Sequence, residues 1–228
     1  MIRKVAFFEL VKDINWYIRR GGNNRNVGLE ILHSWTHMIS IATPHLAEDW
    51  WKILGNEDLI AGRFFETPEK LSSEEMRKLE DEAYLRSFLE QGRKVAKIAS
   101  KHVEGSLSSA VVHVSRPWRR KLATSAIEFL EEGNNVKAFA GELAKLEFAQ
   151  GENRGEVMAF WGKRMLPQIF KWSDAEKAMI VGDLDESYVL EKASKFICSE
   201  LGISSISIEA GVDDVGRSST ALPLAPAI

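Results

Sequence analysis

The sequence predicts a mainly α protein, in which an N-terminal helical bundle is followed by a small α+β domain. Apolar residues recur at helical spacing along most of the 228-residue chain. After Gly105 the residue pattern changes, and a short run rich in β-branched residues, Ala110 to Val114, lies between serines. We therefore expect a helical bundle over residues 1–105 and a small α+β domain over residues 106–228.

Three helices are expected at the start of the chain. Residues 3–20 carry apolar side chains mostly at helical spacing, and the sequence GGNN at 21–24 is typical of a helix end followed by a turn. The pattern resumes from Val27 and is interrupted at Thr43-Pro44, because proline lacks the amide donor that a helix interior needs. A short helix should then run from Leu46 to Leu54.

A long helix should begin near Ser72, since Glu75 stands three residues later, as in a capping box. The remaining segments follow from the same periodicities. Helices are expected at 117–132, 135–149, 155–170 and 186–201. Short strands are expected at 110–114, at 206–208 and in the tail, 222–228.

Composition excludes several classes of protein. The single cysteine, Cys198, cannot form an intramolecular disulfide or a cysteine-rich zinc module. No apolar run approaches the ~20 residues of a membrane span, and Glu9, Lys12 and Asp13 interrupt the stretch where a signal peptide would be apolar. We therefore expect a cytoplasmic protein with no membrane partner.

Three of the five histidines stand close together in HSWTHMISIATPHLAEDWW, which raises the question of a metal site. His33 and His37 are four residues apart and could face one ion, with Glu30 one turn earlier. However, the His-Glu-x-x-His pattern of metalloproteases is absent, and packed or surface histidines are the alternative that we favour. We also find no nucleophile elbow, phosphate loop or dinucleotide fingerprint, so we expect no metal, cofactor or catalytic residue in this chain.

The net charge of −3 means that any nucleic-acid surface must be local. Short basic clusters do occur, and each could equally be a solvated helix surface. They are Arg19-Arg20, Arg25, Arg116 to Lys121, and Lys163-Arg164.

Taken as a unit, the histidine stretch resembles a family signature. WTHMISIATPHLAEDWWKILG is similar to a segment in the anticodon-binding bundle of class I aminoacyl-tRNA synthetases, with Pro44, His45, Leu46, Ala47, Glu48 and Trp51 matching its motif. Further segments resemble the archaeal and eukaryotic leucyl-tRNA synthetases in particular. They are FFELVKDINWYIRRGG, EEMRKLEDEAYLRSFLEQGRKVAKIA, AVVHVSRPWRRKLATSAIE and the tail ALPLAPAI. The match runs in order along nearly the whole chain.

This resemblance implies a C-terminal, tRNA-binding portion of an archaeal-type leucyl-tRNA synthetase, which positions tRNA(Leu) by its body and its long variable arm. The resemblance implies that the bundle leans on the tRNA body. Arg19, Arg20 and Arg25 are our candidates for that contact, with a solvated helix end as the alternative for each. In the C-terminal domain, the densest cationic stretch supplies the candidates Arg116, Trp118, Arg119, Arg120 and Lys121. Ala225 departs from the family, which tends to have lysine there.

The His-Ile-Gly-His and Lys-Met-Ser-Lys-Ser signatures of the catalytic core do not occur, so this chain alone should be inactive. Leucylation, with its ATP and Mg²⁺, would belong to a core on a separate catalytic subunit or on another part of the same protein. Two alternatives remain open. One is a protein–protein docking subunit without RNA affinity, and the other is a metal-dependent enzyme that uses His33 and His37.

Overall fold

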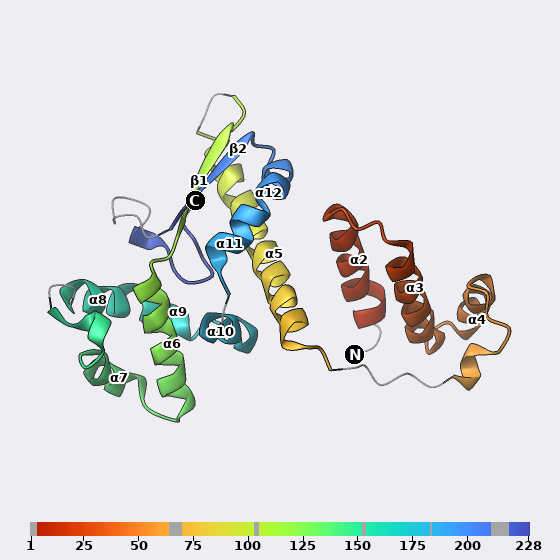
Figure 1. The fold of residues 1–228 in the computed structure, drawn as a ribbon, viewed down its shortest axis with the longest axis horizontal. Coiled ribbons are helices and arrows are strands. Elements are labelled where there is room, and N and C mark those ends of the chain that lie inside the picture. The colour runs from red at the N-terminus through yellow and green to blue at the C-terminus, as the bar shows by residue number, and fades with distance from the viewer. Residues whose placement is uncertain (1–3, 64–69, 103–104, 152–153, 183, 211–218) are drawn as a thin grey trace. The chain divides into compact units, whose positions relative to one another are not determined.

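The computed structural model describes residues 4–63, 70–102, 105–151, 154–182, 184–210 and 219–228. It divides into two compact units, Met1–Lys70 and Leu71–Ile228, each with its own packing (Figure 1). The predicted fold class is confirmed, since helices dominate and β1 and β2 form a small two-stranded sheet. Among the described residues, no helix has the length and apolar character needed to cross a membrane.

The first unit is helical, and α3 lies between α2 and α4 (Figure 1). Its elements are a π-helical turn η1 (Val5–Glu9), α2 (Leu10–Arg19), α3 (Arg25–Ser40), α4 (Pro44–Ile53) and a 3-10 turn η2 (Ile60–Gly62). Pro44 occupies the first turn of α4, where a missing amide donor breaks no helical hydrogen bond. Ile39, Ala47, Trp51 and Ile60 form the buried core that joins α3, α4 and η2.

The second unit is built around one long helix and a parallel strand pair. The long helix, α5 (Ser73–Ala99), starts with the predicted capping box, in which Ser72 and Glu75 exchange hydrogen bonds. The strands β1 (Ser109–Val114) and β2 (Ser205–Ala210) pair in parallel, with Ser109 opposite Ser205 and Val114 opposite Ala210. The other elements are α6 (Pro117–Glu131), α7 (Val136–Leu143), η3 (Glu147–Ala149), α8 (Arg154–Phe160), η5 (Trp161–Met165), α9 (Leu166–Ile169), α10 (Asp174–Val181), α11 (Glu186–Lys192) and α12 (Ser194–Leu201).

Helix α5 packs with the second unit, beside α11 and α12 (Figure 1). It buries Tyr84, Leu85, Phe88 and Leu89 on one side, at helical spacing. The packing therefore divides the chain before α5, whereas the change in sequence pattern placed the boundary after this helix, at residue 105. The domain limits 1–105 and 106–228 stay a prediction.

The structure differs from the sequence prediction in several places. The helix expected over 135–149 ends at Leu143, and η3 follows as a separate turn. Helix α10 was not predicted at all, and the helix expected over 186–201 is divided between α11 and α12 at Ala193. The tail does not form a strand. It makes only two isolated bridges, His113 with Ala227 and Leu222 with Ala225, because Pro223 and Pro226 have no amide hydrogen to donate to a ladder.

Candidate nucleic-acid interface

The turn between α2 and α3 brings three predicted site residues together. Arg19 and Arg20 stand at the C-terminal end of α2, and Arg25 is the first residue of α3. All three are exposed. Because consecutive antiparallel helices meet at their connecting turn, this end of the helix pair carries three guanidinium groups.

Local packing fixes the shape of this turn. The Tyr17 ring lies over Gly22, where a Cβ atom would come within 2.4 Å of the ring. The Tyr17 hydroxyl accepts a hydrogen bond from the Asn24 amide at 3.1 Å, and the Asn24 side chain caps α3 by accepting from Asn26 N. Gly21 has φ +87°, a left-handed conformation that glycine adopts readily. The turn is therefore held by side chains at both ends.

The second predicted cluster, Arg116 to Lys121, starts α6, but its side chains go to different places. Arg116 precedes the helix and its guanidinium lies 3.7 Å from the Glu156 carboxylate of α8. Trp118 is half-buried and meets the Phe160 ring edge to face, with ring centroids 5.2 Å apart. Lys121 is exposed to solvent.

Arg119 is a core residue with only 1% of its surface exposed. Its guanidinium lies 4.5 Å from the centroid of the Phe160 ring, and its Nη1 donates to the carbonyl oxygen of Ala221 at 3.0 Å. The buried charge is thus matched by an aromatic face and by a backbone acceptor of the C-terminal tail. Arg119 connects α6, α8 and the tail.

Arg120 closes the C-terminal end of α10. Its guanidinium donates to the carbonyl oxygens of Met179 at 2.7 Å, Ile180 at 3.1 Å and Gly182 at 2.9 Å, and also to that of Leu184. The last carbonyls of a helix have no partner within it and carry its negative dipole end, so a cation is favourable there. This side chain therefore stabilises the packing of α6 against α10.

The histidine stretch forms packing contacts in the first unit. The rings of His33 and His37, both on α3, lie against Trp51 of α4, with centroids 5.2 and 5.1 Å from that of the indole. No group of three or more metal-ligating side chains occurs in the parts of the chain that the structure describes. The same-face placement predicted for the two histidines thus serves contact with an aromatic ring.

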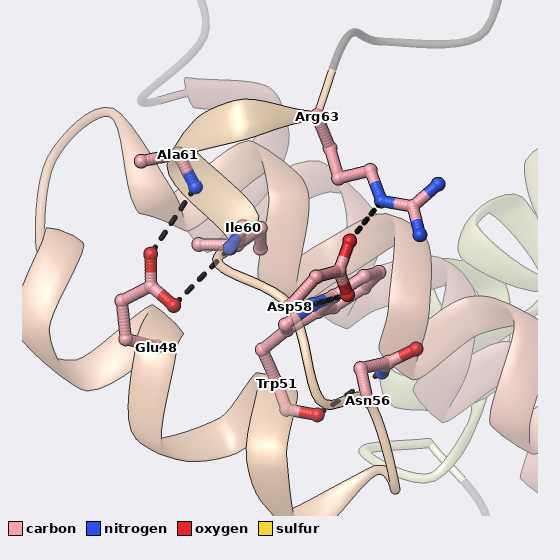
Figure 2. Close-up of polar contacts among 7 residues, drawn as sticks. All are labelled: Glu48, Trp51, Asn56, Asp58, Ile60, Ala61 and Arg63. Atoms are coloured by element: carbon pink, nitrogen blue, oxygen red, sulfur yellow. Dashed lines mark hydrogen bonds and ion pairs between the residues drawn. The ribbon is translucent and has the colours of Figure 1, made fainter.

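Glu48 and Trp51 organise the segment that follows α4 (Figure 2). The Glu48 carboxylate accepts from the amides of Ile60 and Ala61, both at 3.1 Å, and so caps η2. The Trp51 indole donates to Asp58 at 3.2 Å. Hydrogen bonds from Arg63 and then Trp51 lower the pKa of Asp58 below its usual value. Glu48 and Trp51, two residues of the family motif, therefore have structural roles.

Sequence reasoning missed a buried polar contact that holds the tail. Glu186 of α11 accepts from the Tyr84 hydroxyl of α5 at 3.1 Å and from the Leu224 amide at 3.2 Å. Burial raises the pKa of Glu186, while Leu224, Arg120 and Tyr84 act against that rise. Burial, followed by the nearby Glu186 charge, raises the pKa of Tyr84 well above its usual value. No local pattern marks Glu186, because its partners come from distant parts of the chain.

Comparison with known proteins agrees with the resemblance noted in the sequence. Residues 2–111 match the model of the anticodon-binding domain of tRNA ligase. The whole chain aligns with the leucine–tRNA ligase of Methanococcus maripaludis strain C7 at 31% identity, and 98% of it with those of Methanocaldococcus jannaschii at 29% and Pyrococcus furiosus at 28%. In each case the chain spans 22% of the relative's length. Over residues 2–111 the chain is therefore similar to the anticodon-binding domain of tRNA ligases, and over its whole length it is similar to a segment of archaeal leucine–tRNA ligases.

Proposed function

We propose that this chain is a tRNA-binding part of a cytoplasmic leucine–tRNA ligase, where it positions tRNA(Leu) through the tRNA body and the long variable arm. The alignment of the entire chain with leucine–tRNA ligases carries this proposal. Leucylation, and the ATP and Mg²⁺ that it uses, would belong to a catalytic core in the part of the relatives that the chain does not match, or on a separate subunit.

Within this proposal the predicted cations have two kinds of role. Arg19, Arg20 and Arg25 sit exposed around one turn, an arrangement suited to successive phosphates of the tRNA body. In the second unit, exposed Lys121 and the half-buried Arg116 and Trp118 are the proposed RNA contacts. We propose Arg119 and Arg120 as positioning residues, because their guanidinium groups bind backbone carbonyls of this chain.

The domain limits belong to the same proposal. The family model ends at residue 111, close to the limit at residue 105 that the sequence suggested. Packing instead groups α5 with the second unit. We propose that residues 1–105 are the unit shared with other anticodon-binding domains, and that residues 106–228 are the addition characteristic of the leucine enzymes.

The test is binding of the purified chain to leucine tRNA over a range of salt concentrations. Each phosphate that a cation neutralises contributes roughly 0.7 to 0.9 to the slope of log affinity against log salt. The triple variant Arg19→Ala, Arg20→Ala, Arg25→Ala should therefore bind more weakly, with a slope shallower by about 2 to 3. Lys12→Ala is the control, since Lys12 is exposed on α2 and paired with Glu9. Equal slopes for the triple variant and the wild type would contradict the bundle contact.

A second candidate function is docking to a protein partner, and one observation favours it. The first unit exposes several large apolar side chains on η1, α2 and α3, namely Phe7, Phe8, Ile18, Leu29 and Leu32. Binding through such a surface would persist at high salt, since apolar burial does not release counterions. Salt-insensitive capture of a catalytic subunit, without RNA affinity, would favour this alternative.

A further inference from the structure

Phe170 is the most exposed aromatic residue among those that the structure describes, with 67% of its surface open to solvent. It follows α9, which continues the helical run of α8 and η5. An aromatic side chain that stays exposed contributes little to the free energy of folding, because its apolar faces remain hydrated. The ring is therefore accessible to a ligand.

The backbone that carries Phe170 is anchored on both sides. Met165 and Ile169 before it, and Trp172 after it, are buried to at least 95%. The amides of Lys171 and Trp172 both donate to the Gln168 carbonyl oxygen, at 2.8 and 3.3 Å. The ring is therefore presented from a fixed turn, and little conformational entropy would be lost when a ligand packs on it.

Three cations accompany the ring. Lys163 and Arg164 lie in η5, and Lys171 is the next residue after Phe170; all are exposed. Lys163 and Arg164 precede Phe170 by seven and six residues in this helical run, so they lie within about 10 Å of it along the chain, and Lys171 adjoins it. In the described residues, none of the three cations forms an ion pair.

We propose that Lys163, Arg164, Phe170 and Lys171, the Phe170 surface, bind an unstacked nucleotide of RNA, with its base on the Phe170 ring and the flanking phosphates at the three cations. A rigid exposed aromatic beside unpaired cations suits single-stranded nucleic acid, because every base has a π-face and every linkage a negative charge. An apolar protein partner would leave three cations buried and unpaired, which is costly. The inference rests on the proposed RNA-binding function and adds a second contact to it.

The experiment measures binding of the full chain to leucine tRNA and to a short single-stranded RNA labelled with a fluorescent adenine analogue. Phe170→Ala should weaken RNA binding by about 5- to 100-fold, the range that base–aromatic stacking gives, with little change in salt slope. Phe170→Leu should lose most of the same affinity, because it keeps apolar volume but not the ring. The triple variant Lys163→Ala, Arg164→Ala, Lys171→Ala should instead reduce the slope by about 2.

Two matched controls lie on the same unit. Tyr188→Ala removes another exposed aromatic side chain. The triple variant Lys94→Ala, Lys97→Ala, Lys101→Ala removes the same charge from exposed positions in the last part of α5 and just after it. Both should bind RNA like the wild type. If the two triple variants weaken RNA binding equally, the effect comes from net charge alone, and the proposed RNA site at the Phe170 surface is contradicted.

The outcomes also separate this inference from the proposed function. Leucine tRNA that binds wild type, Phe170→Ala and Phe170→Leu equally would overturn the Phe170 surface and leave the proposed function standing. If the short RNA binds in a way that depends on Phe170 and leucine tRNA does not bind, the proposed function is overturned and the Phe170 surface stands. Failure of both RNAs to bind would overturn both proposals.

Discussion

The indole ring of Trp51 stacks on the imidazole ring of His37, with ring planes 18° apart. The two residues come from α4 and α3, and His33 completes the contact by meeting the same indole edge to face. Trp51 is nearly buried, at 6% exposure, in the core of the first unit. The histidines that suggested a metal site thus belong to helix packing.

The first prediction concerns metals. Addition of Zn²⁺ or of a chelator should leave the thermal unfolding midpoint of the chain unchanged, because His33 and His37 face an aromatic ring rather than further ligands. Differential scanning calorimetry on metal-loaded and chelated protein checks this. The metal-site alternative would be supported if Zn²⁺ raised the midpoint of the wild type but not that of the double variant His33→Ala, His37→Ala.

The second prediction compares two adjacent carboxylates on α4. Glu48→Ala should reduce the free energy of unfolding by about 1–2 kcal/mol, because two amides of η2 lose their acceptor. Asp49→Ala, at an exposed position, is the matched control and should change little. Urea denaturation of both variants decides the point. Equal losses of stability would mean that the cap of η2 contributes nothing of its own.

The third prediction separates neighbouring cations of α6. Arg120→Met should destabilise the second unit by about 2–4 kcal/mol, because the carbonyls at the end of α10 lose their donor. Lys121→Ala should leave stability unchanged and should weaken RNA binding. Chemical denaturation and salt-dependent RNA binding are measured on both. Arg120→Met that folds as well as wild type would contradict the positioning role.

The fourth prediction concerns pH. Burial raises the pKa of Glu186 above that of the unfolded chain, with Arg120 and Tyr84 opposing and Asp185 assisting the rise. Its contribution to stability is therefore greatest below the unfolded pKa and is lost as pH rises through the folded pKa. Glu186→Gln keeps an acceptor for the Leu224 amide and cannot ionise. Relative to wild type, this variant should gain stability as the pH rises above the unfolded pKa of a glutamate, about 4.3.

Urea denaturation of wild type and Glu186→Gln at several pH values measures that difference. The control is Glu186→Ala, which should be less stable at every pH, because the Tyr84 hydroxyl and the Leu224 amide lose their partner. A stability difference between wild type and Glu186→Gln that stays constant with pH would contradict the raised pKa.

Local signals were read correctly from the sequence where they are sufficient by themselves. The capping box at Ser72 and Glu75 depends only on neighbours, and so does the helix break near Pro44; both are confirmed, although α4 begins at Pro44 itself rather than at Leu46. Helix α10 carries the same signal, with Ser173 and Glu176 exchanging hydrogen bonds, and the spacing alone could have revealed it.

Partners distant in the sequence could not be foreseen. Arg119 and Arg120 look like one cationic patch with Lys121, but successive helical residues point about 100° apart. Their carbonyl partners, Ala221 for Arg119 and Ile180 for Arg120, come from the tail and from α10. Charge density in a sequence therefore indicated a cluster that the fold distributes between the core and the surface.

The measurement that tests the central claim most directly is the affinity of this chain for leucine tRNA with and without its long variable arm, over a salt series. We expect tight binding to the intact tRNA that weakens steeply with salt and is markedly weaker without the arm. Equal affinity for both tRNAs would contradict recognition of the arm, and no salt-sensitive affinity for either would contradict tRNA binding by this chain.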